Sequence, residues 1–275
     1  MILAEKILEL TRQNRGFAVA TIVKTGGSVP GKVGFKILVE ADGGTTGTVG
    51  GGELEKEVIQ ECHRRMSERK SSLQEYILTE KEENVQSRKG TKIIPMMCNG
   101  RATVFYEIHH AATTVYVMGG GHVGQALTYF LHRLGYYIIL IDNRKEFANS
   151  QMNPKTHQII CQDYLTYARE VEVIPDSFFV VLTHGHQYDY DIARIILERK
   201  LPLHYLGIIA SKSKAHQIKS KLIEDLGEKV DLSVLYTPIG LDIGGDSDIE
   251  IALSIAAEIQ AVSHEKKVPH MSRKT

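Results

Sequence analysis

The most constraining stretch of this sequence is MGGGHVGQAL, which begins at Met118 and completes the strand-like run VYVM. Gly119, Gly121 and Gly124 fit the pattern G-x-G-x-x-G. We expect Gly119 to make the tight turn, Gly121 to admit a phosphate to the backbone, and Gly124 to let the next helix pack on the sheet. The N-terminus of that helix offers amides and a partial positive charge to an anion. The stretch therefore predicts a Rossmann-like parallel sheet with a phosphate site at its loop.

An acidic residue closes the next strand-like run, YYIILID, at Asp142. In a dinucleotide-binding unit such a carboxylate binds a ribose hydroxyl, and Arg144 nearby would accept an additional phosphate. The same loop also occurs as a turn that is kept for packing and binds no nucleotide, because glycine is common. The sequence thus predicts the topology and leaves the ligand open.

The chain of 275 residues divides into two parts with different patterns. Residues 1–110 contain neighbouring β-rich runs and two amphipathic helices, which predicts a small α+β domain with a largely antiparallel sheet. Residues 111–262 alternate strands with helices, which predicts an α/β domain with a doubly wound parallel sheet. The last helix opens at Ser247 with the capping box SDIE. We expect the tail, residues 263–275, to be disordered.

Composition excludes several classes of partner. Lys and Arg total 33 and so do Asp and Glu, which argues against nucleic acid or an anionic membrane as the main partner. No run has the length of a membrane span, and the N-terminus lacks the apolar core of a signal peptide. Cys62, Cys98 and Cys161 are too few and too scattered for a disulfide framework or a zinc ribbon. We therefore expect a cytoplasmic protein with reduced thiols.

A second glycine cluster, GTVGGGELE, also runs from a strand into a helix. It has no G-K-[ST], so it is not a P-loop, but the amides around Gly50, Gly51, Gly52 and Glu53 can form an anion nest. A tight strand-to-helix turn explains the cluster equally well. The upstream loop GGSVPGKVG, which contains Ser28, favours a binding role. Two neighbouring loops that both lack bulky side chains are more than the formation of turns alone would need.

The stretch LTHGHQYDYD places His184 and His186 just past a predicted strand, followed by Asp189 and Asp191. The spacing invites a metal site, but no second cluster of ligands is evident. Residues beyond the strand ends of an open parallel sheet line its ligand crevice. We therefore favour contacts between the two histidines and a bound cofactor or substrate, with loop and capping roles as the alternative for Asp191.

Cys98 stands in IIPMMCNG, between two methionines and an Asn-Gly turn. Its thiol is either a small apolar group that packs in a core or a soft ligand presented on a tight turn. The chain contains no G-x-S-x-G elbow, and Cys98 has no evident base partner, so nucleophilic catalysis finds little support.

Taken together, these motifs resemble the XdhC/CoxI family, the accessory proteins of xanthine dehydrogenase and related molybdenum hydroxylases. The resemblance covers the chain from about Phe17 to Val262. The motifs that carry it are GGSVPGKVGFKILV, GTVGGGELE, CNG, VYVMGGGHVGQAL, IDNR, LTHGHQYD, YLGIIASKSKA and PIGLDIGGDSDIEIALSIAAEI.

The resemblance implies a non-enzymatic chaperone that binds molybdenum cofactor, supports its sulfuration with a cysteine desulfurase, and delivers it to an apo molybdenum hydroxylase. Whether the cofactor is the molybdopterin mononucleotide or a dinucleotide stays open. The glycine loops would hold its phosphate, and Cys98 would be a soft donor near molybdenum. The family's turn usually reads Cys-Gly-Gly, and here Asn99 replaces the first glycine; Asn tolerates positive φ, so the turn survives.

Two alternatives use the Rossmann domain. The first is an NAD(P)-dependent oxidoreductase in which His184 or His186 transfers a proton near the nicotinamide. The second is a regulatory module that senses NAD(P) and has no turnover. For all three functions we expect a homodimer, because a site built between small domains often recruits a second subunit.

Overall fold

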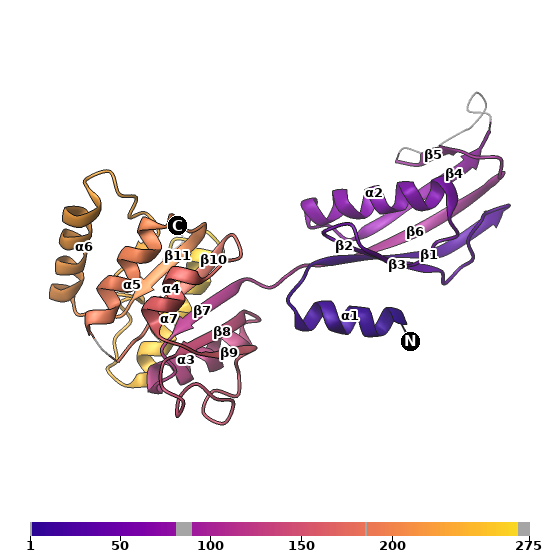
Figure 1. The fold of residues 1–275 in the computed structure, drawn as a ribbon. Helices are drawn as coiled ribbons and strands as arrows, with labels where there is room; N and C mark the ends of the chain where they lie inside the picture. The colour runs from indigo at the N-terminus through magenta and orange to yellow at the C-terminus, as the bar shows by residue number, and fades with distance from the viewer. Residues whose placement is uncertain (1, 81–89, 185, 269–275) are drawn as a thin grey trace. The chain divides into compact units, whose positions relative to one another are not determined.

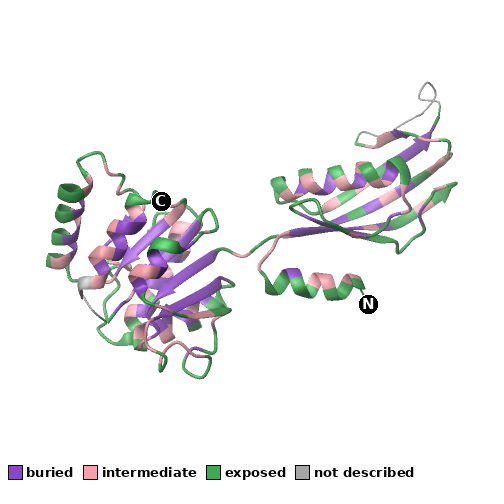
Figure 2. Cartoon of the chain, viewed as in Figure 1, coloured by how far each residue is buried: buried purple, intermediate pink, exposed green. Residues whose placement is uncertain are grey.

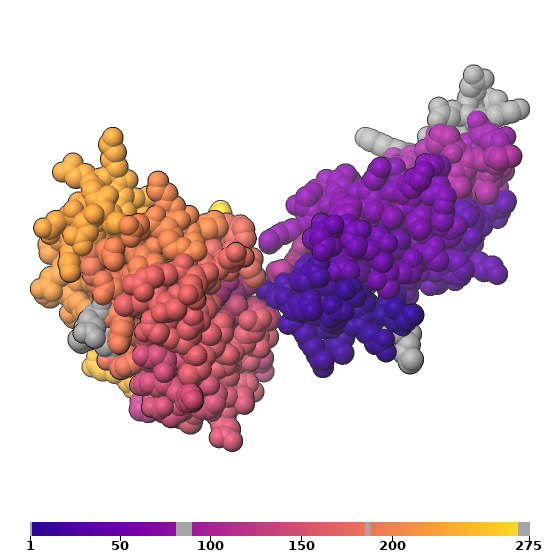
Figure 3. Space-filling view, viewed as in Figure 1, coloured from indigo at the N-terminus to yellow at the C-terminus, as the bar shows by residue number. Residues whose placement is uncertain are grey.

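The computed structural model describes residues 2–80, 90–184 and 186–268 (Figure 1). It divides into two compact units, Met1–Ala111 and Ala112–Thr275. Each unit has its own six-stranded sheet, with a hydrophobic core on each face of the sheet. The last strand of the first unit ends at His109, and the first strand of the second begins at Thr114. Figure 3 shows the same view with the atoms as spheres, coloured along the chain by residue number.

The first unit has a largely antiparallel sheet, as predicted, with strand order β3-β2-β1-β6-β4-β5. Only the pair β4–β5 is parallel among the described pairings. The elements are α1 (Ile2–Arg12), β1 (Phe17–Gly27), β2 (Lys36–Glu40), β3 (Thr45–Gly47), α2 (Gly52–Glu68), β4 (Ser72–Thr79), β5 (Lys92–Pro95) and β6 (Gly100–His109).

A helix covers each face of this sheet. Successive side chains of a strand point to opposite faces, and β1 shows the result. Ala18, Ala20 and Ile22 belong to the core that α2 covers, whereas Phe17 and Val19 pack with α1 in a smaller core. The strands β1 and β6 lie at the centre of the sheet. Figure 2 colours the residues of both units by burial.

The second unit has a fully parallel sheet with strand order β9-β8-β7-β10-β11-β12. Numbered within the unit this is the order 3-2-1-4-5-6 of the Rossmann fold, so the predicted topology is confirmed. The elements are β7 (Thr114–Met118), α3 (His122–Arg133), β8 (Tyr137–Asp142), β9 (Gln158–Cys161), α4 (Tyr164–Glu170), β10 (Ser177–Val181), α5 (His186–Glu198), β11 (Leu203–Ile208), α6 (Lys212–Leu226), β12 (Leu235–Tyr236) and α7 (Asp248–Ser263).

Helices cover both faces of the parallel sheet. One core joins the sheet to α4, α5 and α6, and the other joins it to α3 and α7. The central strands β7, β8 and β10 are buried along their whole length, which explains their continuous apolar sequences. The order of strands reverses between β7 and β10, so the loops after these two neighbouring strands lie at the switch point where open α/β sheets bind ligands.

Several elements differ from the prediction. Asp191, for which loop and capping roles were the alternative, lies inside α5, because this helix begins at His186. The short elements β5, α4 and β12 were not predicted. The capping box at Ser247 is confirmed, since its hydroxyl and the Glu250 carboxylate satisfy each other's backbone amides. Helix α7 continues to Ser263, and residues 269–275 of the predicted disordered tail lie outside the described residues. Within the described residues, no helix is long and apolar enough to span a bilayer.

Candidate functional site

Three loops of the first unit meet by direct backbone contact. A Cβ atom on Gly50 would lie 2.5 Å from the amide nitrogen of Gly31, and one on Gly100 would lie 2.2 Å from the Ser28 carbonyl oxygen. The Ser28 amide also donates a 3.0 Å hydrogen bond to the Asn99 carbonyl. The structure therefore brings together the Ser28 loop, the second glycine cluster and the turn that carries Cys98. We call this arrangement the three-loop site.

Cys98 lies at the edge of the core of the first unit. Its side chain is half-buried and packs against that core, as Val29 and Met96 also do. The other two thiols differ. Cys62 is fully buried, and burial raises its pKa to about 12. Cys161 is exposed in the second unit.

Glu55 fills part of the predicted anion nest. Its Oε2 accepts hydrogen bonds from the amides of Val49, at 2.9 Å, and Gly51, at 3.2 Å, and from the Thr48 hydroxyl. Burial raises the pKa of this carboxyl, but the hydrogen bonds outweigh that effect and lower it overall. Glu55 was not among the site residues predicted from the sequence, although its position in the first turn of α2 was a signal.

The remaining polar groups of the three-loop site face solvent. Ser28, Gly52 and Glu53 are exposed, and Glu53 pairs with Lys56 at 2.6 Å. The N-cap residue of α2 is Gly51, with φ +78°, and no side chain among the described residues caps this helix. The first amides of α2 thus keep hydrogen-bonding capacity for an anion.

The glycines of the dinucleotide loop occupy three different environments. Gly119 has φ +126°, and an added Cβ would lie 2.3 Å from the Leu182 carbonyl oxygen. A Cβ atom added to Gly124 would lie 2.0 Å from the Gly119 carbonyl oxygen. A Cβ atom added to Gly121 would have Nη2 of Arg144 as its nearest neighbour, at 4.0 Å. The first two positions serve the turn and the packing, and the space beside Gly121 is open.

Asp142 and Arg144 form a bidentate ion pair beside this loop. The Asp142 carboxylate is fully buried and accepts the Gly120 amide at 2.8 Å and three donors of Arg144, its amide at 3.0 Å and Nε and Nη2 both at 2.9 Å. Burial raises the pKa of Asp142, but these hydrogen bonds lower it overall. The Arg144 guanidinium also lies over the Phe147 ring, 4.0 Å from its centroid. A ribose hydroxyl would reach Asp142 only by displacing Arg144.

The histidine segment follows β10, next to the dinucleotide loop in the sheet order. His184 is exposed, and its ring lies near Tyr164 and Tyr188, with centroids 6.2 and 6.1 Å away. Asp189 is buried, accepts the Thr183 hydroxyl at 2.6 Å and pairs with Lys214 at 2.6 Å. His186 begins α5, and its side chain lies outside the described part of the chain. Within that part, no group of three metal-ligating side chains exists.

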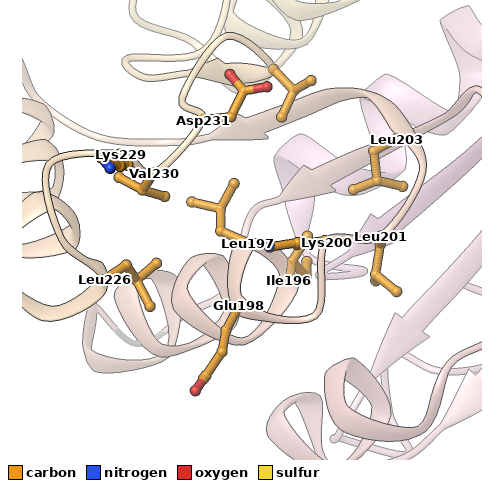
Figure 4. A pocket seen from close by; sticks show the side chains of 11 residues that line it. Ile196, Leu197, Glu198, Lys200, Leu201, Leu203, Leu226, Lys229, Val230 and Asp231 are labelled. Carbon is orange, nitrogen blue, oxygen red and sulfur yellow. The ribbon is translucent and has the colours of Figure 1, made fainter.

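A cavity of about 680 Å³ lies elsewhere in the second unit, between the end of α5 and the start of β11 (Figure 4). Its walls are mainly apolar, from Ile196, Leu197 and Leu226, and lysines 200 and 229 stand at its edge. Among the described residues, none of the site residues predicted from the sequence lines it. The residues that line this cavity are therefore different from those at the carboxyl ends of β7 and β10.

Comparison with known proteins identifies the family. The model of the XdhC Rossmann domain matches residues 115–259, and the model of the XdhC and CoxI family matches residues 10–77. The chain belongs to the XdhC family. The resemblance found in the motifs is thereby confirmed. Cys98 lies between the two matched segments, so its role rests on the geometry of the three-loop site.

Two relatives of this XdhC family member are longer than the chain itself. It is 30% identical to the uncharacterized protein YqeB of Escherichia coli (strain K12) over 93% of the chain and 45% of that protein. It is 31% identical to a probable xanthine dehydrogenase subunit of Bacillus subtilis (strain 168) over 46% of the chain and 35% of that protein. The chain thus spans less than half the length of either relative.

A solved structure shares the fold of this XdhC protein over nearly its whole length. The structure is described as a xanthine dehydrogenase from Bacillus halodurans, and the TM-score is 0.52 at 20% identity, with 96% of both chains covered. At this level of identity the likeness concerns the fold alone.

Proposed function

We propose that this XdhC protein is an accessory protein that binds molybdenum cofactor, supports its sulfuration and delivers it to an apo molybdenum hydroxylase of the xanthine dehydrogenase type. Family membership supports the proposal, as does the name of the Bacillus subtilis relative. The observation that carries it is the three-loop site, where the turn with the half-buried Cys98 adjoins two glycine-rich loops.

The donor groups of the three-loop site fit the chemistry of this cofactor, a phosphorylated pterin dithiolene that holds molybdenum. A thiolate is a soft ligand, so Cys98 would bind near the metal. The uncapped first turn of α2, at Gly52 and Glu53, would hold the phosphate, and the exposed Ser28 hydroxyl would bind a polar edge of the pterin. When bound, the cofactor supplies redox chemistry to the client enzyme, whereas these residues bind and orient it.

Two protein partners follow from the proposal. A cysteine desulfurase would supply the sulfur, and an apo-hydroxylase would receive the finished cofactor. Both must reach the three-loop site, which agrees with the solvent exposure of Ser28, Gly52 and the neighbouring Met97, whose exposed fraction is 90%.

The test is retention of pterin by protein purified from a host that makes molybdenum cofactor, measured by fluorescence after oxidation. We expect near-stoichiometric pterin, lowered about tenfold or more by Cys98→Ala, because the substitution removes one ligand of the metal. Cys161→Ala, which removes an exposed thiol from the second unit, is the matched control and should leave pterin unchanged.

Each outcome of this test has a distinct meaning. Pterin that is retained equally by Cys98→Ala would keep the function and restrict Cys98 to packing. A protein without pterin, under conditions that load a known cofactor carrier, would contradict the proposal.

A second candidate function rests on the open space beside Gly121 and on the Arg144 guanidinium next to it. These features favour binding of NAD(P) in the second unit, either for hydride transfer or for sensing. Calorimetric titration with NADH and NADPH tests binding, and hydride exchange with a carbonyl compound separates an oxidoreductase from a sensor. The absence of heat with both nucleotides would contradict this candidate.

A further inference from the structure

Helix α7 is apolar on more sides than its own unit covers. Ala252, Ile255 and Ile259 are fully buried against the sheet and α3. On another side of the helix, Ile249 is 59% exposed and Leu253, one turn later, is 47% exposed. Ala257 and Ala261 continue the same line at the spacing of one turn and are half-buried. A helix that is apolar on two faces is normally covered on both, and among the described residues of its own unit nothing covers this second face.

The two ends of this exposed face carry opposite charges. Asp246, Asp248 and Glu250 lie at the N-terminus of α7 and are exposed. The residues just after its C-terminus include Lys266 and Lys267, also exposed, with a single acidic neighbour, Glu265, in the stretch 264–268. The helix is therefore acidic at one end and basic at the other, with Leu253, Ala257 and Ala261 between them.

We propose that this face binds the same face of a second copy of the chain, with the two α7 helices antiparallel across a two-fold axis near Ala257. In an antiparallel pair, Leu253 of each copy packs on Ala261 of the other, and the acidic end of each lies beside Lys266 and Lys267 of the other. A parallel pair would place like charges together. Charge complementarity thus selects a closed, symmetric dimer of this one arrangement.

This inference goes beyond the proposed function and does not depend on it. The dimer surface consists of α7 and the residues that flank it, whereas the three-loop site belongs to the first unit. The two tests are therefore independent, and a monomeric protein that retains pterin would contradict the dimer alone.

The first experiment measures the association state of the full chain by sedimentation velocity over a wide range of concentrations. We expect a dimer that Leu253→Glu weakens by at least tenfold, because the substitution places two charges in the apolar centre of the interface. Ile174→Glu is the matched control, since Ile174 is also 47% exposed, lies in the same unit and is outside α7. Circular dichroism checks that both variants are folded.

A second experiment tests the antiparallel arrangement. Lys266→Glu/Lys267→Glu makes both ends of the face acidic, and Asp246→Lys/Asp248→Lys makes both ends basic. We expect each variant to self-associate at least several-fold more weakly than the original chain, and an equimolar mixture to form a heterodimer. A chain that is monomeric at every concentration, a dimer that Leu253→Glu leaves intact, or a mixture without heterodimer would overturn the inference.

Discussion

One added methyl group distinguishes the glycines of the dinucleotide loop. Gly124→Ala would place Cβ 2.0 Å from the Gly119 carbonyl oxygen, so we expect the free energy of unfolding of the second unit to fall by about 2 kcal/mol or more. Gly121→Ala meets no atom closer than 4.0 Å and should change stability by less than about 1 kcal/mol. Urea denaturation measures both, and equal losses would contradict this distinction.

At the same scale, the sequence predicted where the glycine loop lies but not which hydrogen bonds the side chains beside the loops form. The spacing of Gly119, Gly121 and Gly124 fixes a loop after a strand, and the structure agrees. The hydrogen bonds of Asp142 with Arg144, and of Glu55 with Val49, depend on side-chain directions that no spacing encodes. The Asp142 carboxylate, which the sequence offered to a ribose, therefore has a protein partner, and Glu55 occupies the Gly51 amide that the sequence offered to an anion.

At the scale of elements, Glu61 connects α2 to β5. Its carboxylate is 1% exposed and accepts Nε of Arg65 at 2.6 Å and Nζ of Lys92 at 3.0 Å. Burial raises the pKa of Glu61, but hydrogen bonds from Arg64, Lys92 and Arg65 outweigh it and lower the pKa to about 2. The folded state therefore binds the proton of this carboxyl less tightly than the unfolded state does.

The stabilisation by Glu61 is present above its unfolded pKa and is lost as pH falls from about 5 towards 2. We expect Glu61→Gln to lower the free energy of unfolding by roughly 2–3 kcal/mol at pH 7, and the difference to shrink at acid pH. Urea denaturation across this pH range is the measurement. Glu53→Gln, in an exposed pair, should change stability by less than about 1 kcal/mol. A Glu61→Gln difference that does not vary with pH would argue against this account.

Helices and strands could be predicted where the sequence carries a continuous apolar run or a capping motif. The strands β7, β8 and β10 have continuous apolar runs, and α7 has its capping box. The element β5 is short, ends at Pro95, and is stabilised by pairing with β4. Its register depends on a contact between segments distant in sequence, so local pattern did not reveal it.

At the scale of the whole molecule, each unit contains a complete sheet with its own core. We expect fragments 1–111 and 112–275, expressed separately, each to unfold in one cooperative transition. Near-ultraviolet circular dichroism during guanidinium denaturation is the measurement. A fragment without fixed tertiary structure would show that its fold depends on the other unit.

The hydrogen bonds of Glu55 also bear on the rates at which a ligand arrives and leaves. Because the carboxylate holds the amides of Val49 and Gly51 in fixed directions, the loop is ordered before any ligand reaches it. Association then needs no slow rearrangement, and the negative charge beside the site limits the lifetime of a bound phosphate. We therefore expect the phosphate contact to form in one fast phase and to add little to the retention of a ligand, which would rest mainly on the contact between Cys98 and the metal.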